Sequence, residues 1–190
     1  SDTNGSSDLF LHDMTTSETT RVSVDSTGVE GNGFSDYAAI SPDGRFVAFW
    51  SQANNLVSND TNGVGDIFIH DSQADVTEVV SIGPGGMLGN DVSRYPSMSA
   101  DARYLVFESR ATNLVSGDAN GSFDVFLRDR QSNTTSLISV SSSGVQANTN
   151  CGDPVISGNG TFVAFRSQSS TLVPGDNNGL TDVFVRDIVA

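Results

Sequence analysis

The chain has 190 residues, 36% of them hydrophobic, and a formal net charge of −14, and all nine of its cationic side chains are arginines. This length supports a single domain with one core, and the abundance of Ser, Thr, Asn, Asp and Gly is typical of short strands joined by turns. The acidic balance disfavours binding to nucleic acids or anionic membranes, and the short apolar runs exclude insertion of a helix into a membrane.

The first segments of the chain alternate between apolar and polar residues, as strands do. Residues 8–13 (DLFLHD) and 19–24 (TTRVSV) show this alternation on either side of a polar turn. After a glycine-rich loop, residues 37–41 (YAAIS) lead through a Pro-Asp-Gly turn into residues 45–51 (RFVAFWS). A long polar loop then reaches residues 66–71 (DIFIHD), where the pattern starts again. The sequence therefore predicts units of four short strands.

One acidic motif, Asp-x-Asn-Gly-x-x-Asp followed by an apolar residue and Phe, occurs four times at an interval of 58 residues. We therefore divide a single repeat domain, 1–190, into units 1–58, 59–116 and 117–174 and a partial unit 175–190. A fixed period indicates stacked supersecondary units. Tandem four-stranded units with aromatics at fixed positions predict an all-β propeller, with about three blades in this chain. A parallel β-helix is the alternative, although its repeats are normally much shorter.

Three hairpin segments, SPDGRFVAF, SADARYLVF and SGNGTFVAF, precede segments of the form DIFIHD. Together they resemble the PD40 repeat of TolB-like propellers over essentially the whole chain, and Ala102 and Asn159 depart from the pattern at two of the turns. The resemblance implies a propeller fold. Proteins of this type serve as periplasmic adaptors, as substrate gates on peptidases and as lectin-like binders. The resemblance also implies a secreted, cell-surface or periplasmic protein of bacterial type.

The same acidic motif occurs near both ends of the chain, and this arrangement suggests how the chain assembles. If the strands of a unit are lettered A to D, the chain runs C-D, A-B-C-D, A-B-C-D, A-B-C. Three interpretations fit this order: a segment of a longer propeller, two copies in a ring of about six blades, or copies joined end to end in a filament. Because unpaired strand edges bind one another readily, we expect self-association or a protein partner rather than a lone monomer.

The acidic loops place oxygen ligands at positions i, i+2 and i+6, with a glycine at i+3. This spacing lets side chains converge on a hard cation, and a donor set without His or Cys favours calcium over zinc. Structural Ca²⁺ is therefore the expected cofactor. The alternative is turn chemistry alone, since Asn-Gly favours turns and Asp side chains cap them. The candidate metal ligands are Asp2, Asn4, Asp8, Asp60, Asn62, Asp66, Asp118, Asn120, Asp124, Asp176, Asn178 and Asp182.

Comparison of the units also assigns roles to other side chains. Phe49 and the other repeated phenylalanines are expected in the core between units, and the apolar pair Leu56 and Val57 is expected to anchor the polar loop against the sheets. His12 and His70 are replaced by arginine in the other units, so we interpret them as solvent-facing strand residues. Trp50 is replaced by glutamate and by arginine, so we expect it to point outward, where it could contact a ligand.

No nucleophile elbow, zinc-protease motif or phosphate loop is present in the sequence. A catalytic pair should be unique in a chain, whereas these acids recur in every unit, so we assign no catalytic residues. We expect a non-enzymatic extracellular scaffold stiffened by calcium. The alternatives are a lectin-like propeller that binds a glycan and, less favoured, a hydrolase or lyase that uses the acidic face.

Overall fold

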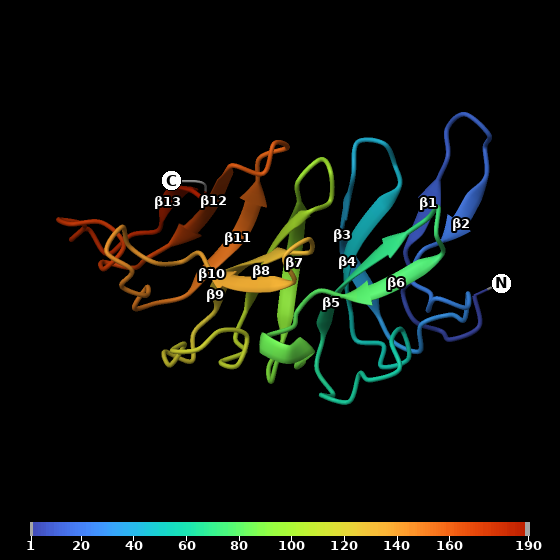
Figure 1. Cartoon of the computed structure of the whole chain (residues 1–190), viewed down its shortest axis with the longest axis horizontal. Coiled ribbons are helices and arrows are strands. Elements are labelled where there is room, and N and C mark those ends of the chain that lie inside the picture. Colours follow the sequence, from blue (N-terminus) through green and yellow to red (C-terminus); the bar gives the residue numbers. More distant parts are fainter. Residues whose placement is uncertain (1, 189–190) are drawn as a thin grey trace.

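The computed structural model describes residues 2–188, which form thirteen strands and one short 3₁₀ turn (Figure 1). All strand pairs are antiparallel and make four sheets. This confirms the all-β class. The limits of the predicted domain, at residues 1 and 190, lie outside the described residues. The division into repeat units and the number of blades stay predictions.

Each sheet is built from strands that follow one another in the chain. The first sheet pairs β1 (Phe10–His12) with β2 (Thr19–Arg21). The second contains, in order, β3 (Ser35–Ile40), β4 (Phe46–Ser51), β5 (Asp66–Asp71) and β6 (Val76–Val79). The third contains β7 (Ser93–Met98), β8 (Tyr104–Ser109), β9 (Asp124–Asp129) and β10 (Thr134–Leu137). The fourth contains β11 (Cys151–Ile156), β12 (Phe162–Ser167) and β13 (Asp182–Asp187), and the 3₁₀ turn η1 (Pro84–Gly86) lies between β6 and β7.

The four sheets lie side by side in chain order, with the two ends of the chain at opposite sides of the molecule (Figure 1). The β4–β5 and β8–β9 loops and the β6–β7 connection lie along the lower edge of this view, whereas the β3–β4, β7–β8 and β11–β12 hairpins lie along the upper edge. In an up-and-down sheet, alternate connections emerge from the same end. The long acidic loops therefore gather on one face of the molecule.

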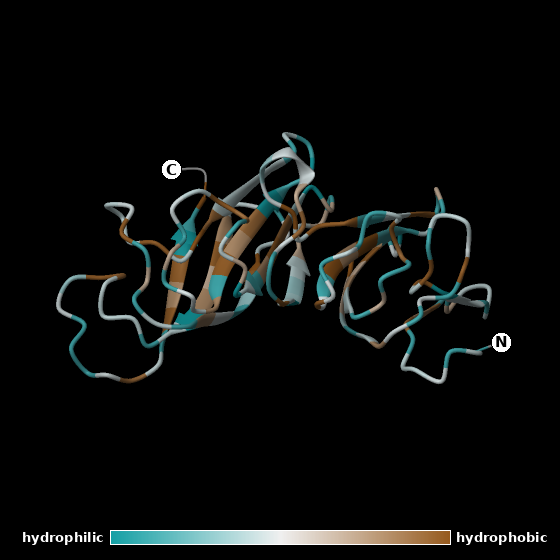
Figure 2. Cartoon of the chain, turned by 90° about the horizontal axis from the view of Figure 1, so that it is seen from below, coloured by the Kyte–Doolittle hydropathy of each residue, from teal (hydrophilic) through white to brown (hydrophobic). Residues whose placement is uncertain are grey.

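The core lies between neighbouring sheets, where the strands carry most of the apolar side chains (Figure 2). Ile67 and Ile69 of β5 are buried together with Phe107 of β8 and Phe126 of β9. Successive side chains of a strand point to opposite faces, so each inner sheet contributes to two such layers. The predicted core role of the repeated phenylalanines is confirmed in these layers. Phe10 of the two-stranded first sheet is exposed and is the exception.

The prediction that the histidine position faces solvent was wrong for the two inner sheets. His70 and the equivalent Arg128 are both buried. Each lies two residues after a core phenylalanine, on the same face of the strand, so its side chain points between the sheets. His70 Nδ1 lies 3.0 Å from Thr77 Oγ1, which gives the ring a polar partner there. His12 in the first sheet is exposed, as predicted.

Trp50 also lies differently from the prediction. It is half-buried and packs against the core between the second and third sheets, with its ring centroid 6.0 Å from that of Tyr37. Glu108 occupies the same position in the third sheet and is buried, because Arg94 Nε donates to its Oε1 at 2.6 Å. Variation at this position between units reflects different local partners, so it did not indicate exposure.

The long loops are held against the sheets at defined points. Leu56 and its equivalents Leu114 and Leu172 are buried, which confirms the leucine of the predicted anchor, whereas Val57 is half-buried and its equivalent Val173 is exposed. The side chain of Asn32 donates to Asn54 Oδ1 at 2.7 Å and accepts from Asn54 N at 3.0 Å. Asn90 makes the equivalent pair of bonds in the next unit. These contacts fix each β4–β5-type loop to the connection that precedes the sheet.

Candidate metal sites in the acidic loops

The second acidic loop, residues 59–66, brings two aspartates into the protein interior. Asp60 is 8% exposed and Asp66, the first residue of β5, is 0% exposed. Ser81 Oγ donates to Asp66 Oδ1 at 2.6 Å and accepts from Ile67 N at 3.0 Å. The serine hydroxyl thus connects the start of β5 to the segment that follows β6 and fixes the orientation of the Asp66 carboxylate.

The motif asparagine of this loop lies between the turn and the second aspartate. Asn62 Nδ2 donates to Asp66 Oδ2 at 2.6 Å and to the Gly89 carbonyl at 2.9 Å. Its Oδ1 accepts from Val64 N at 3.1 Å, which closes an Asx-type turn. The same turn closes in the other loops on Asn4, Asn120 and Asn178. The turn predicted as the alternative to metal binding is therefore present in all four loops. It does not exclude a cation, because a carboxylate oxygen that accepts one hydrogen bond keeps a second lone pair.

The two aspartates of the second loop carry charge that nearby groups do not fully compensate. Burial, together with a smaller contribution from the charge of Asp60, raises the pKa of Asp66 to about 6, against the hydrogen bonds from Ser81 and Asn62. Burial also raises the pKa of Asp60, against a hydrogen bond from the backbone N of Asn62 to its carboxylate. Within the described residues, Asp60 Oδ1 is buried and has no hydrogen-bond partner. Paired carboxylates in such a setting favour either a shared proton or a bound cation.

The third acidic loop, residues 117–124, has the same motif but a different partner. Asp118 and Asp124 are again buried, and Ser139 Oγ donates to Asp124 Oδ1 at 2.6 Å. Here Gln146 Nε2 donates to both acids, to Asp118 Oδ1 at 2.7 Å and to Asp124 Oδ2 at 2.9 Å. Burial still raises the pKa of Asp124, against hydrogen bonds that include the one from Gln146. A neutral amide thus joins the two carboxylates.

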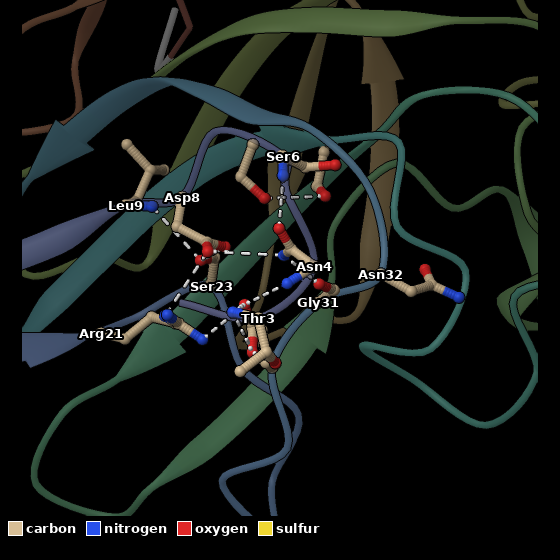
Figure 3. A network of polar contacts seen from close by, with 12 residues as sticks. Thr3, Asn4, Ser6, Asp8, Leu9, Arg21, Ser23, Gly31 and Asn32 are labelled. Carbon is tan, nitrogen blue, oxygen red and sulfur yellow. Dashed lines mark hydrogen bonds and ion pairs between the residues drawn. The ribbon is translucent and has the colours of Figure 1, made fainter. Parts of the chain in front are cut away.

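In the first loop a cationic side chain, Arg21, lies beside the second aspartate, Asp8 (Figure 3). Arg21 Nη1 lies 2.9 Å from Glu30 Oε1, and Arg21 Nε lies 3.5 Å from Asp8 Oδ2. Thr3 donates to Glu30 through its backbone N at 2.9 Å and through its hydroxyl at 2.6 Å, and these bonds lower the pKa of Glu30 to about 2. Asp2, Asp8 and Glu30 each have an oxygen within 4.8 Å of the others. Three carboxylates and one guanidinium therefore meet here.

The fourth loop is more open than the second and third. Asn178 Nδ2 donates to Asp182 Oδ2 at 3.2 Å, so the contact between the motif asparagine and the second aspartate is kept. Asp176 and Asp182 are half-buried. Water can therefore hydrate these carboxylates better than those of the second and third loops.

Sequence reasoning found the loop residues but missed the residues that face them. The serine that binds the second aspartate was detectable, because it is the same in all three full units. Arg21 and Gln146 gave no such signal, because their equivalents in the other units have different chemistry. The residues missed are Arg21, Ser23, Glu30, Ser81, Ser139 and Gln146.

No protein-family model and no curated protein sequence matches the chain. Solved structures do match. TolB from Acinetobacter baumannii has a TM-score of 0.53 and 17% identity, over 96% of this chain and 35% of that chain. The tricorn protease has a TM-score of 0.56 and 13% identity, over 98% of this chain and 16% of that chain. Oligogalacturonate lyase from Vibrio parahaemolyticus has a TM-score of 0.52 and 14% identity, over 96% of this chain and 42% of that chain.

Likeness at these identities is evidence for the fold alone. The chain spans less than half the length of each of these three proteins. They include a protease, a lyase and TolB, so the fold does not decide between an enzyme and a binding protein. In the described part of the chain, no helix is long and apolar enough to cross a membrane. The fold implied by the three hairpins is supported: the chain has a TolB-like β-propeller fold.

Proposed function

We propose that the protein is a non-enzymatic structural or interaction scaffold, secreted or on a bacterial surface or in the periplasm, whose sheets bind further sheets of the same kind. The observation that carries this proposal is an uncovered apolar face on the fourth sheet. Val183 and Val185 of β13 are 75% and 68% exposed. Ile67 and Ile69, which occupy the same positions in β5, are 0% and 1% exposed. Burying such a side chain stabilises a contact by about 1.5–3 kcal/mol.

A second copy of the chain, or a further sheet of a longer chain, is a fitting occupant for this face. In β5 the equivalent residues are covered by the next sheet, which presents phenylalanines such as Phe107 and Phe126. The first sheet of another copy presents Phe10, which is exposed on its outer side. Contact between these two faces repeats the packing already used inside the chain. Because it joins different faces of two copies, the contact is heterologous and builds a ring or a filament.

Light scattering across a range of protein concentrations tests the assembly. The wild-type mass is expected to rise above the monomer mass of 19.9 kDa as concentration increases. The double variant Val183→Asp/Val185→Asp should stay at the monomer mass, because it charges the exposed face. Val29→Asp, at another exposed valine, is the matched control and should behave like the wild type. A wild-type protein that stays monomeric at millimolar concentration contradicts self-association.

The proposal includes structural Ca²⁺ in the acidic loops. The support is a donor set made only of oxygens, with buried carboxylate pairs in the β4–β5 and β8–β9 loops, which lie along the same edge of the molecule in Figure 1. A thermal melt of the metal-stripped protein with and without millimolar Ca²⁺, and with Mg²⁺ as the control, tests it. Selective binding to the folded state should raise the melting temperature by several degrees. If Ca²⁺ causes no shift, the loops serve as turns only.

Carbohydrate binding is a second candidate function, and an aromatic cluster favours it. Tyr37 is exposed, its ring meets that of Tyr95 edge to face at 4.6 Å, and Trp50 lies 6.0 Å away. Tyr37 and Tyr95 line a shallow hollow of about 370 Å³. A glycan array with the wild type and Tyr37→Ala tests this candidate, since specific binding should be lost in the variant. Turnover of an oligosaccharide that Asp60→Asn abolishes would contradict the non-enzymatic role.

A further inference from the structure

One position facing the acidic loops differs among the three full units, although the same isolated bridge forms there in each unit. Glu30, Leu88 and Gln146 each form an isolated antiparallel bridge with a residue shortly after the last strand of the preceding sheet. They are separated by the 58-residue repeat interval. The three side chains therefore start from equivalent places next to the three loops, and a difference between the loops can be traced to them.

Two of the units supply a polar partner for the loop aspartates. In the third, the Gln146 amide donates to both Asp118 and Asp124. In the first, the Arg21 guanidinium lies against both Asp8 and Glu30. In the third unit the amide of one side chain therefore bridges the two loop aspartates, whereas in the first unit the guanidinium joins one loop aspartate, Asp8, to Glu30.

The second unit has the two buried carboxylates but no such partner. Leu88 has no polar atom in its side chain, and Val79 replaces the arginine of the first unit. Asp60 is more than nine-tenths buried, and its Oδ1 has no hydrogen-bond partner in the described structure. Asp60 is close enough to Asp66 that its charge raises the pKa of Asp66. A buried carboxylate oxygen with no donor is costly, so this place favours a positive ligand.

We propose that the second loop is a divalent-cation site in which Asp60 and Asp66 bind Ca²⁺, at the place that the Gln146 amide fills in the third unit. The inference rests on the calcium part of the proposed function and narrows it from four loops to one. The two carboxylates supply anionic oxygens, and loop carbonyls and water complete the six to eight oxygens that Ca²⁺ takes. The absence of His and Cys from the loop disfavours zinc.

Exchange of the residue at this bridge tests the proposal without removing a ligand. Ca²⁺ is titrated calorimetrically into the metal-stripped wild type, Leu88→Gln and Gln146→Leu, up to about 10 mM, since extracellular sites bind in the 10⁻⁴–10⁻³ M range. The wild type should bind one ion per chain, and Leu88→Gln should bind at least ten-fold more weakly. Gln146→Leu should gain a second ion. Both changes introduce residues that the chain already uses at this bridge, so they suit the backbone.

Asp60→Asn is a second variant, which removes a ligand and should also lose binding. The proposal is overturned if Leu88→Gln binds as tightly as the wild type or if Gln146→Leu gains no ion. If the wild type binds four Ca²⁺ ions and Leu88→Gln binds the same number with the same affinity, this inference is overturned. The proposed function, with calcium in all four loops, would then still stand. A wild type that binds no Ca²⁺ would overturn both. The proposed self-association is tested separately, by light scattering.

Discussion

The second and third acidic loops carry the same motif, the same serine contact and the same buried aspartate pair, yet their electrostatics differ. In the third loop, Gln146 donates to both acids. In the second, Leu88 stands at the same bridge and Asp60 Oδ1 has no partner among the described residues. The comparison teaches that a repeated motif does not by itself define a metal site. The residue across from the loop decides whether the carboxylates are already compensated.

Removal of the serine contact is expected to lower the stability of the protein the most. Ser81→Ala leaves Asp66 Oδ1 and Ile67 N without their buried partner, at about 1–3 kcal/mol for each group. We expect the free energy of unfolding to fall by about 3 kcal/mol. The matched variant Ser139→Ala should cost about 1 kcal/mol less. In that variant Asp124 keeps bonds from both Gln146 and Asn120, whereas in Ser81→Ala Asp66 keeps only the bond from Asn62. Urea unfolding in EDTA measures both, and equal losses would show that Gln146 does not support its loop.

The pH dependence of stability should distinguish the loops next. The folded pKa of Asp66, about 6, lies above its ordinary value of 3.8. Between these values the folded state keeps a proton that the unfolded chain has lost, so the free energy of unfolding falls as pH rises from about 4 to about 6. One pKa unit corresponds to about 1.4 kcal/mol, and with allowance for solvent screening we expect a fall of about 2 kcal/mol.

Leu88→Gln is the control for this pH effect. A glutamine amide beside Asp66 stabilises the ionised carboxylate, so the fall between pH 4 and pH 6 should become smaller. Urea unfolding at one-unit pH steps in EDTA measures the two slopes. Acids with lowered pKa values, such as Asp71 with a pKa of about 2, change their protonation only below pH 4. They therefore do not contribute to the slope of stability between pH 4 and pH 6. Identical slopes in the two proteins would contradict the assignment to Asp66.

The motif asparagines give the smallest expected effect. Asn62→Ala removes the donor to Asp66 Oδ2 as well as the turn. Asn120→Ala removes the equivalent turn, but Asp124 Oδ2 keeps its bond from Gln146. The second-loop variant should therefore be less stable than the third-loop variant by about 1 kcal/mol, the usual net value of one hydrogen bond. Thermal unfolding of the pair in EDTA checks this, and the reverse order would count against the comparison.

The strands of this protein could be predicted from sequence because they alternate clearly and end in turn residues. The predicted segment 45–51 corresponds to β4, Phe46–Ser51, and 66–71 coincides with β5. The bulges in β3, β7 and β11 could not be predicted. They place Tyr37, Tyr95 and Asp153 at φ of 52°, 55° and 50°, where bulky residues are rare, so tertiary packing must hold them there.

The candidate site was predictable only in part, for a related reason. Recurrence revealed the ligand residues, such as Asp60 and Asp66, because every loop needs them for its turn and its anchor. The features that separate one loop from another depend on contacts across about 22 to 28 residues of chain, such as Gln146 with Asp124 and with Asp118. Single-sequence patterns do not encode those contacts, so Leu88 and Gln146 looked like ordinary drift between units.

The most direct test of the central claim is to follow the side-chain carboxyl ¹³C resonances of the aspartates by NMR while Ca²⁺ is added to the metal-stripped protein. We expect the resonances of Asp60 and Asp66 to shift with a common saturation curve, while those of Asp118 and Asp124 stay in place. Equal shifts in both loops, or a shift confined to the third loop, would contradict the claim that the residue facing the loop selects the metal site.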